Sequence, residues 1–333
     1  MKGFKAMLRI PDWVLALCLV VLAVPVWRWW QSAQEPRLPE VCLAVGDHLP
    51  TPTSGMIRIA GGRFKMGSDE FRAEEAPVRD VSVGAFWIDA HDVTNAQFAR
   101  FVRETGYITV AERATQGQPA GSPVFVTPLE IRDMQDLGQW WKFIPGANWL
   151  HPEGPVSDIT RRQSHPVVHV AYEDASAFAR WAGRTLPTEV QWEFAARSGL
   201  DGKRFSWGNE HEPDDEPQGN YWRGIFPVLN FGSKGFKGTS PVGCFPANGY
   251  GLYDMTGNVW QWTRDAWTPD HDPTSSLTQP ASYVETQVIK GGSFLCATNF
   301  CLRYRPAARQ PGDSGGGASH IGFRTVFEPS DND

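Results

Sequence analysis

Glycine and proline interrupt this chain so often that long helices and long strands are excluded from most of it. The 333 residues include 33 glycines and 26 prolines, together with 15 tryptophans. Glycine and proline punctuate regular elements, whereas tryptophan supplies large apolar surfaces that anchor irregular chain. We therefore expect an α+β domain with low regular secondary structure, held together by aromatic side chains.

The first 30 residues carry the pattern of an export signal. An uncharged run at residues 13–27, WVLALCLVVLAVPVW, follows three basic residues and precedes Arg-Trp-Trp. The run is short for a membrane span, but no small-residue cleavage site follows it and the trailing aromatic residues suit an interfacial anchor. We interpret residues 1–30 as a signal anchor, with a cleaved signal peptide and a buried helix as the alternatives.

The distribution of charge predicts how the chain is oriented in a membrane and argues against a nucleic acid partner. More basic residues precede the apolar run than follow it, which predicts a membrane-anchored protein whose main domain is periplasmic or otherwise extracytoplasmic. An oxidising compartment would permit paired cysteines. The net charge is −6 and no basic run lies outside the N-terminus, so no nucleic acid partner is expected.

The remaining chain divides by composition into three parts. Residues 31–55 are rich in proline and lack a hydrophobic period, so they are expected to be a linker. Residues 56–327 are expected to form one domain, and residues 328–333 a polar tail. Within the domain, MIRIAGGRFKMG predicts a hairpin and VSVGAFWID a further strand.

Three helices are predicted from their start and stop signals. Thr94 and Gln97 form a capping box for the first, and Gly106 ends it. The second is expected over residues 173–182. Thr188 and Gln191 cap the third, with Gly199 as its stop.

The five cysteines leave several chemistries open. Cys18 lies in the apolar run, and the other four, Cys42, Cys244, Cys296 and Cys301, permit three pairings. Spacing alone allows a Cys296–Cys301 disulfide, a metal site, or a redox or nucleophilic role.

The sequence around the last two cysteines favours a chemical role over a purely structural disulfide. Gly291, Gly292 and Ser293 would let the backbone and a small hydroxyl approach Cys296 in an open pocket. Nearby arginines would favour thiolate over thiol, unless they lie on a solvated or ion-paired face: Arg303, Arg305 and Arg309. Two soft thiolate donors suit Cu(I) better than structural zinc.

A second candidate metal site follows the turn-rich NGYG. In DMTGNVWQW, side-chain and backbone oxygens could bind Ca²⁺, a hard cation, from Asp254, Gly257, Val259 and Gln261. The alternative is a tight turn whose tryptophans, Trp260 and Trp262, pack in the core.

Several segments in collinear order resemble the formylglycine-generating enzymes, also called sulfatase-modifying factors. They extend from Met56 to Val326 and include GGRFKMGS, FWIDAHDVTNAQFARFV, GANWLHPEGP, RTLPTEVQWEFAAR, NGYGLYDMTGNVWQW, GGSFLCATNFCLRYRPAAR and SHIGFR. The resemblance implies the formylglycine-generating-enzyme fold, which is related to C-type lectins. Motifs such as RTLPTEVQWEFAAR are specific to the fold, and the cysteine pair is more specific to the activity.

The resemblance also implies an activity and its residues. Family members are copper-dependent oxidases that use O2 and a thiol reductant to convert the cysteine of an unfolded sulfatase segment, Cys-x-Pro-x-Arg, to Cα-formylglycine. The positions of Cys296 and Cys301 hold Cu(I), with Ser293 and Trp260 beside the oxygen pocket. Trp149 and Arg309 match positions along the peptide groove. His320 stands where an asparagine is common, in the segment that forms a wall of the substrate site.

This chain departs from the family pattern at both calcium sites and at the substrate wall. A second Ca²⁺ site would use Asn220, Tyr221 and Phe236, but Lys234 stands where an acidic residue is usual. Gln261 stands where a glutamate is usual. QPGDSGGGASH replaces the usual wall sequence before SHIGFR.

The sequence therefore leaves two classes of function open. The first is an oxidase that makes formylglycine in sulfatases or a related peptide. The alternative is a non-catalytic binding or maturation factor of the same fold, with Cys296 and Cys301 joined as a disulfide. The iron-dependent sulfoxide synthases that share the domain are excluded, because the chain lacks their histidine-bearing iron domain.

Overall fold

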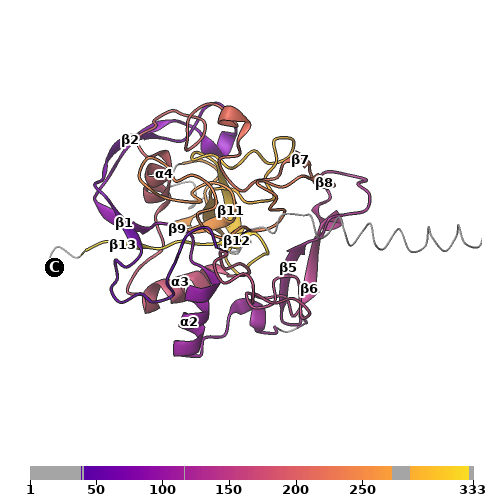
Figure 1. Cartoon of the computed structure of the whole chain (residues 1–333). Helices are drawn as coiled ribbons and strands as arrows, with labels where there is room; N and C mark the ends of the chain where they lie inside the picture. The colour runs from indigo at the N-terminus through magenta and orange to yellow at the C-terminus, as the bar shows by residue number, and fades with distance from the viewer. Residues whose placement is uncertain (1–38, 40, 116, 272–285, 330–333) are drawn as a thin grey trace, which may run out of the picture. The chain divides into compact units, whose positions relative to one another are not determined.

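The computed structural model describes residues 39, 41–115, 117–271 and 286–329 of the chain (Figure 1). Its α-helices are α2 (Asn95–Thr105), α3 (Tyr172–Trp181) and α4 (Glu189–Arg197). Its strands are β1 (Met56–Ile59), β2 (Gly62–Met66), β3 (Arg79–Val83), β4 (Phe86–Asp89), β5 (Gly121–Phe125), β6 (Trp141–Pro145), β7 (Gly224–Ile225), β8 (Leu229–Asn230), β9 (Trp260–Ala266), β10 (Thr286–Lys290), β11 (Arg309–Asp313), β12 (Ile321–Gly322) and β13 (Val326–Phe327). Short 3-10 turns lie at Ala73–Glu75, Val110–Glu112, Leu137–Gln139 and Pro213–Asp215. The predicted α+β class with little regular structure is confirmed.

A four-stranded sheet carries the chain's C-terminal motifs. Its strand order is β11-β10-β9-β12, antiparallel except for β12, which runs parallel to β9. The first four residues of β9, Trp260 to Thr263, are all buried, so both faces of this strand are covered. Helix α4 contacts β9 and β10 of this sheet and also the paired strands β2 and β3. The chain between β10 and β11 contains both Cys296 and Cys301.

The capping boxes predicted the helix starts correctly. The Thr94 hydroxyl accepts the Gln97 N–H at 3.3 Å, and the Gln97 side-chain oxygen accepts the Thr94 N–H at 3.0 Å. Thr188 and Gln191 make the same reciprocal pair before α4. Helix α2 ends at Gly106, which is left-handed with φ 68°. Helix α4 ends one residue earlier than expected, at a left-handed Ser198.

The hairpin predicted over MIRIAGGRFKMG is wrong. Strand β1 pairs with β4 and β2 pairs with β3, so the two halves of this segment enter different sheets. The segment VSVGAFWID likewise divides at Gly84 into β3 and β4. Gly61 makes the crossing possible, because it has φ 77° and a Cβ there would lie 2.5 Å from the Val83 carbonyl oxygen.

The described part of the expected linker contacts the domain. Cys42 forms a disulfide with Cys244. The Arg184 guanidinium donates to the carbonyls of Pro52 at 2.7 Å and Ser54 at 2.6 Å. Residues 41–55 are therefore fastened to the domain ahead of the expected boundary at Met56, through partners that lie far along the sequence.

Removal of the Cys42–Cys244 disulfide is expected to lower stability. The bond closes a loop with a sequence separation of 202 residues, and cross-links over long loops restrict the unfolded chain most. The Cys42→Ser, Cys244→Ser double variant should lose about 2–4 kcal/mol of unfolding free energy. Denaturant titration under non-reducing conditions measures this, and a midpoint equal to that of the unmodified chain would contradict it.

The structure does not support the expected membrane-anchored, extracytoplasmic domain. Among the described residues, none of the helices has the length and apolar character needed to cross a bilayer. Residues 1–30, from which the anchor was predicted, lie outside the described residues, as do the C-terminal residues 330–333 of the expected tail.

Candidate functional site

Cys296 and Cys301 face each other across a tight loop. Their Cα atoms are 4.9 Å apart and the sulfurs are joined as a disulfide. Ala297 closes the loop, because its carbonyl accepts the N–H groups of Cys301 at 3.1 Å and Leu302 at 2.9 Å. Cys296 is buried, whereas Cys301 is half-buried. Of the three chemistries that spacing left open, the structure supports a directly paired cysteine couple with one accessible member.

The Gly-Gly-Ser stretch packs the loop tightly instead of opening a pocket. Gly292 has φ 70°, and a Cβ there would lie 2.9 Å from the backbone of Arg303 and Tyr304. Ser293 is fully buried; its carbonyl accepts the Cys296 N–H at 2.9 Å and its hydroxyl oxygen accepts the Leu295 N–H at 3.2 Å. These glycines therefore permit close backbone packing, and Ser293 fixes the turn that presents Cys296.

Aromatic side chains enclose the cysteine loop. Cys296, Trp260 and Trp149 belong to one buried hydrophobic cluster. A second cluster holds the loop's own apolar residues together with aromatic rings from outside it: Trp140, Trp222, Phe226, Phe294, Leu295 and Ala297. Phe300, within the loop, stacks on Phe226 with ring centroids 4.2 Å apart. The site is thus an apolar environment around two sulfurs.

The three arginines after the loop are paired with carboxylates. Arg303 donates to Glu74 at 2.6 Å, and Arg305 binds both oxygens of Glu75. The expectation that these cations act on the sulfurs is therefore not supported for Arg303 and Arg305. The alternative, an ion-paired face, is what the structure contains.

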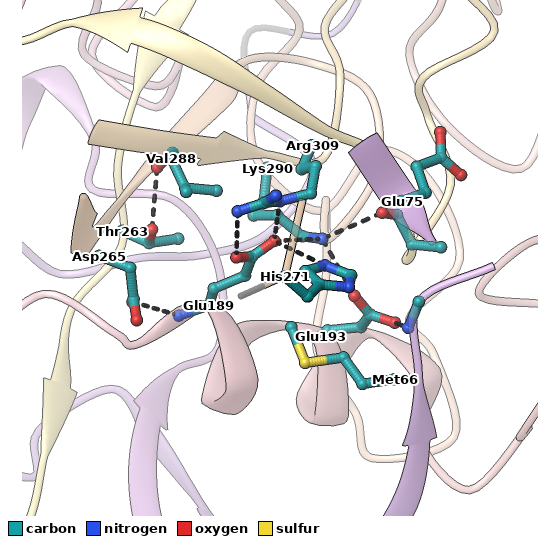
Figure 2. A network of polar contacts seen from close by, with 12 residues as sticks. Met66, Glu75, Glu189, Glu193, Thr263, Asp265, His271, Val288, Lys290 and Arg309 are labelled. Carbon is teal, nitrogen blue, oxygen red and sulfur yellow. Dashed lines mark hydrogen bonds and ion pairs between the residues drawn. The ribbon is translucent and has the colours of Figure 1, made fainter. Parts of the chain in front are cut away.

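Arg309, expected along the peptide groove, lies in a buried ion-paired network. Its side chain is 2% exposed and binds both oxygens of Glu189, at 2.8 and 3.0 Å. Its remaining donors reach the carbonyls of Glu74, Thr268 and Asp270. Figure 2 shows Arg309 directed into this network. All three nitrogens of this guanidinium therefore already donate within the protein.

Trp149 and His320 lie in different surroundings. Trp149 is buried against Phe98, with ring centroids 5.4 Å apart. Its indole N–H has no partner among the described residues. The His320 ring packs on Trp141 with centroids 4.6 Å apart, and the His320 carbonyl accepts the Trp260 N–H at 2.9 Å. Burial lowers the pKa of His320 to about 3, so its ring is neutral at pH 7.

His169 is a buried histidine, and it allows a test of how stability depends on pH. Its backbone N–H donates to Ala318, its ring binds the Pro152 carbonyl at 2.8 Å, and burial lowers its pKa to about 4. The unfolded chain, with a histidine pKa of about 6.5, takes up this proton first. The stability that neutral His169 contributes is thus present above pH 6.5 and lost as the pH falls toward 4.

The His169→Asn variant should show a weaker pH dependence. Asparagine tolerates the left-handed backbone of this position, where φ is 61°. The loss of unfolding free energy between pH 6.5 and 5.5 should shrink by about 1 kcal/mol relative to the unmodified chain. Denaturant titrations at the two pH values measure it, and an unchanged difference would show that His169 takes up protons alike in both states.

The predicted Ca²⁺ site at Asp254, Gly257, Val259 and Gln261 does not fit a calcium ion. The Gln261 side-chain oxygen already accepts hydrogen bonds from Arg324 Nε at 2.7 Å and Trp192 Nε1 at 2.6 Å. Arg324 also donates to the carbonyl of Asp254 at 3.1 Å. A guanidinium therefore supplies the positive charge here. Burial raises the pKa of Asp254 to about 6.

The second Ca²⁺ set offers no carboxylate. Asn220 is buried and its side-chain oxygen has no hydrogen-bond partner among the described residues. The carbonyl oxygens of Tyr221 and Phe236 each accept a bond from Ser233. Lys234 donates to the Cys244 carbonyl at 3.0 Å. A lone amide oxygen next to a lysine does not fit a divalent cation.

Comparison with known proteins identifies the family. The family described as "Sulfatase-modifying factor enzyme 1-like domain" matches residues 44–329. A Mycobacterium tuberculosis protein named "Formylglycine-generating enzyme" is 48% identical over 293 residues, covering 82% of this chain and 98% of its own. This chain belongs to the sulfatase-modifying factor family.

A second relative is described as inactive. A Mus musculus protein named "Inactive C-alpha-formylglycine-generating enzyme 2" is 40% identical over 311 residues, covering 89% of this chain and 95% of its own. Among solved structures, PvdO from Pseudomonas aeruginosa matches with a TM-score of 0.59 and 22% identity, covering 86% of this chain and all of its own. The latter likeness concerns the fold alone.

The sequence patterns missed the residues that hold the cysteine loop of this family member. The Trp222 N–H donates to the Cys296 carbonyl at 3.0 Å, and the Phe294 N–H donates to the Asn258 carbonyl at 3.0 Å. Phe226 donates its N–H to the Asn299 side chain at 3.3 Å. The unusual tryptophan content was the available signal, but it could not indicate which rings gather at this loop.

Proposed function

We propose that this chain converts a cysteine of a sulfatase, within Cys-x-Pro-x-Arg, to Cα-formylglycine. The observation that carries the proposal is the Cys296–Cys301 couple in an apolar loop, with Cys296 buried and Cys301 half-buried. The chain is 48% identical to a formylglycine-generating enzyme over nearly that protein's whole length. The substrate would be an unfolded segment, because the reacting cysteine must reach a loop enclosed by aromatic side chains.

The overall reaction consumes a reductant. The thiol-bearing methylene group of the peptide cysteine, O2, two electrons and two protons yield the aldehyde, hydrogen sulfide and water. The peptide carbon is oxidised, O2 is reduced, and a thiol reductant of the cell supplies the remaining two electrons. The same reductant would open the Cys296–Cys301 disulfide to two thiols.

The reduced couple fits Cu(I). Two soft sulfur donors lie side by side, and soft donors select Cu(I). No group of three or more His, Cys, Asp or Glu side chains is suited to a metal in the part of the chain that the structure describes. The two cysteines would therefore be the protein donors. Copper would supply O2 activation and a binding position for the substrate thiolate.

The surrounding residues would position the reacting groups and exclude water from the site. The Ser293 oxygen accepts the Leu295 N–H, so its hydroxyl proton remains available for donation to a reacting group. Trp260, 2% exposed and in the cluster of Cys296, would exclude water from the reacting sulfur. The backbone bond from Trp222 to Cys296 would keep this cysteine in place when the disulfide is opened.

A second candidate function is supported by the disulfide itself. A closed couple has no free thiolate, and a relative 40% identical is named as inactive. The chain would then be a binding or maturation factor of the same fold.

Conversion of a synthetic peptide tests the proposal. The full chain, reduced and supplied with Cu(I), O2 and a thiol, should turn a Cys-x-Pro-x-Arg peptide into one that reacts with an aminooxy probe. The matched Ser-x-Pro-x-Arg peptide should not react, since a hydroxyl is a poor Cu(I) ligand. Binding of the peptide without any aldehyde would favour the maturation factor.

A further inference from the structure

A cavity of about 400 Å³ lies outside the cysteine loop and has a basic lining. Three segments form it, residues 67–71, 197–204 and 305–307, with Val78. Its cationic side chains outnumber its acidic ones by four to two: Arg197, Lys203, Arg204 and Arg305 against Asp69 and Glu70. None of the site residues proposed above lines this cavity.

Two residues of the cavity wall, Arg197 and Arg305, bind carboxylates of a buried ionic network, part of which is shown in Figure 2. Glu193 binds Arg197 at 2.7 Å and Lys290 at 3.1 Å, and Lys290 lies 3.4 Å from Glu189. Glu189 also binds Arg309, and Glu75 binds Arg305.

The fully buried members of this network do not balance in charge. Four are cations, Arg197, Lys290, Arg305 and Arg309, and three are carboxylates, Glu75, Glu189 and Glu193. Among the half-buried neighbours, Arg79 is a cation, whereas Asp265 and Asp270 are carboxylates, so the excess is confined to the buried members.

Some of the buried cations lie where an anion could approach them, although each of these is already paired with a carboxylate. Two of the four buried cations, Arg197 and Arg305, line the cavity. Arg305 lies over the Phe71 ring at 3.7 Å, and Arg204 approaches the same ring at 5.4 Å. Phe71 thus holds one buried and one exposed guanidinium on the same wall.

We propose that this cavity binds a small dicarboxylate anion. The volume lies in the range of sites for small organic ligands, which is about 300–1,000 Å³ and larger than a single inorganic ion requires. The buried guanidinium groups would face one carboxylate, and the exposed Lys203 and Arg204 the other. Glu70 is already paired with Arg204, and Asp69 accepts the Val78 N–H at 3.1 Å, which ties it to the backbone.

The same chemistry has two sources. The anion can be a free dicarboxylate, or an acidic side chain together with the C-terminal carboxylate of a polypeptide. The inference does not rest on the cysteine chemistry, since binding is measured without turnover.

Calorimetric titration of the full chain tests the inference with three probes: succinate, its neutral diamide, and a short peptide ending in aspartate with a free C-terminus. Succinate or the peptide should bind, and the diamide should not. The Lys203→Gln, Arg204→Gln variant should bind about tenfold or more weakly, because it loses two charge-assisted contacts. The Arg132→Gln variant, which alters an exposed ion pair with Glu130, is the matched control and should bind normally.

The outcomes are distinguishable. Binding of succinate alone would identify a free dicarboxylate, and binding of the peptide alone would identify a polypeptide terminus. No binding of either at millimolar concentration would overturn the inference. Equal binding of the diamide, or unaltered binding by the double variant, would overturn it too.

Discussion

The Cys296→Ser variant is expected to lose all detectable formylglycine production while keeping its fold. Serine nearly preserves the side-chain size, and the backbone bonds that fix this position, to Ser293 and from Trp222, do not involve the sulfur. What is lost is one of two soft donors, and an oxygen does not replace it for Cu(I). The Cys301→Ser variant should behave alike, and Cu(I) binding should fall from one equivalent to none in both.

The second cysteine pair supplies the control for this experiment. The Cys42→Ser, Cys244→Ser variant also removes a disulfide but leaves Cys296 and Cys301 intact. It should retain conversion and Cu(I) binding at a temperature where it is folded. Equal activity of the unmodified chain and the Cys296→Ser variant would show that the reaction takes place elsewhere.

The Glu193→Gln variant should be strongly destabilised. Glu193 is fully buried and accepts bonds from Arg197, Lys290 and the Gly67 N–H, the last at 2.8 Å. An amide removes the negative charge and leaves two buried cations with less compensation. Breaking such a buried pair costs about 3–5 kcal/mol. Denaturant titration of the full chain should show this as a lower unfolding midpoint.

An exposed ion pair gives the matched comparison. Glu173 lies 2.9 Å from Arg113, and its side chain is 57% exposed. The Glu173→Gln variant should change the unfolding free energy by about 1 kcal/mol or less, because solvent screens such pairs. If Glu193→Gln and Glu173→Gln have equal effects, the network shown in Figure 2 does not stabilise the fold.

Local signals in the sequence predicted the helices well. The reciprocal bonds of Thr94 with Gln97 and of Thr188 with Gln191 join residues three apart, so the sequence contains both partners. The fold class and the cysteine couple were also predictable, because the motifs that carry them are continuous stretches.

Long-range partners were not predictable from the same signals. β1 and β2 look like a hairpin, but each finds its partner in the segment after residue 78. Arg309 has the sequence position of a groove residue, yet Glu189, 120 residues away, binds it. The oxygen ligands expected around Gln261 are engaged by Arg324, 63 residues further along. A pattern of ligand types does not reveal which cation of the same chain will reach them.

The mass of a Cys-x-Pro-x-Arg peptide after incubation with the full chain is the most direct test of the central claim. The protein should be compared in two states, reduced and loaded with Cu(I), or kept oxidised with the Cys296–Cys301 disulfide closed. The account predicts that only the reduced, copper-loaded protein replaces the peptide sulfur with an aldehyde oxygen. An unchanged peptide mass with a verified copper-loaded protein would contradict it.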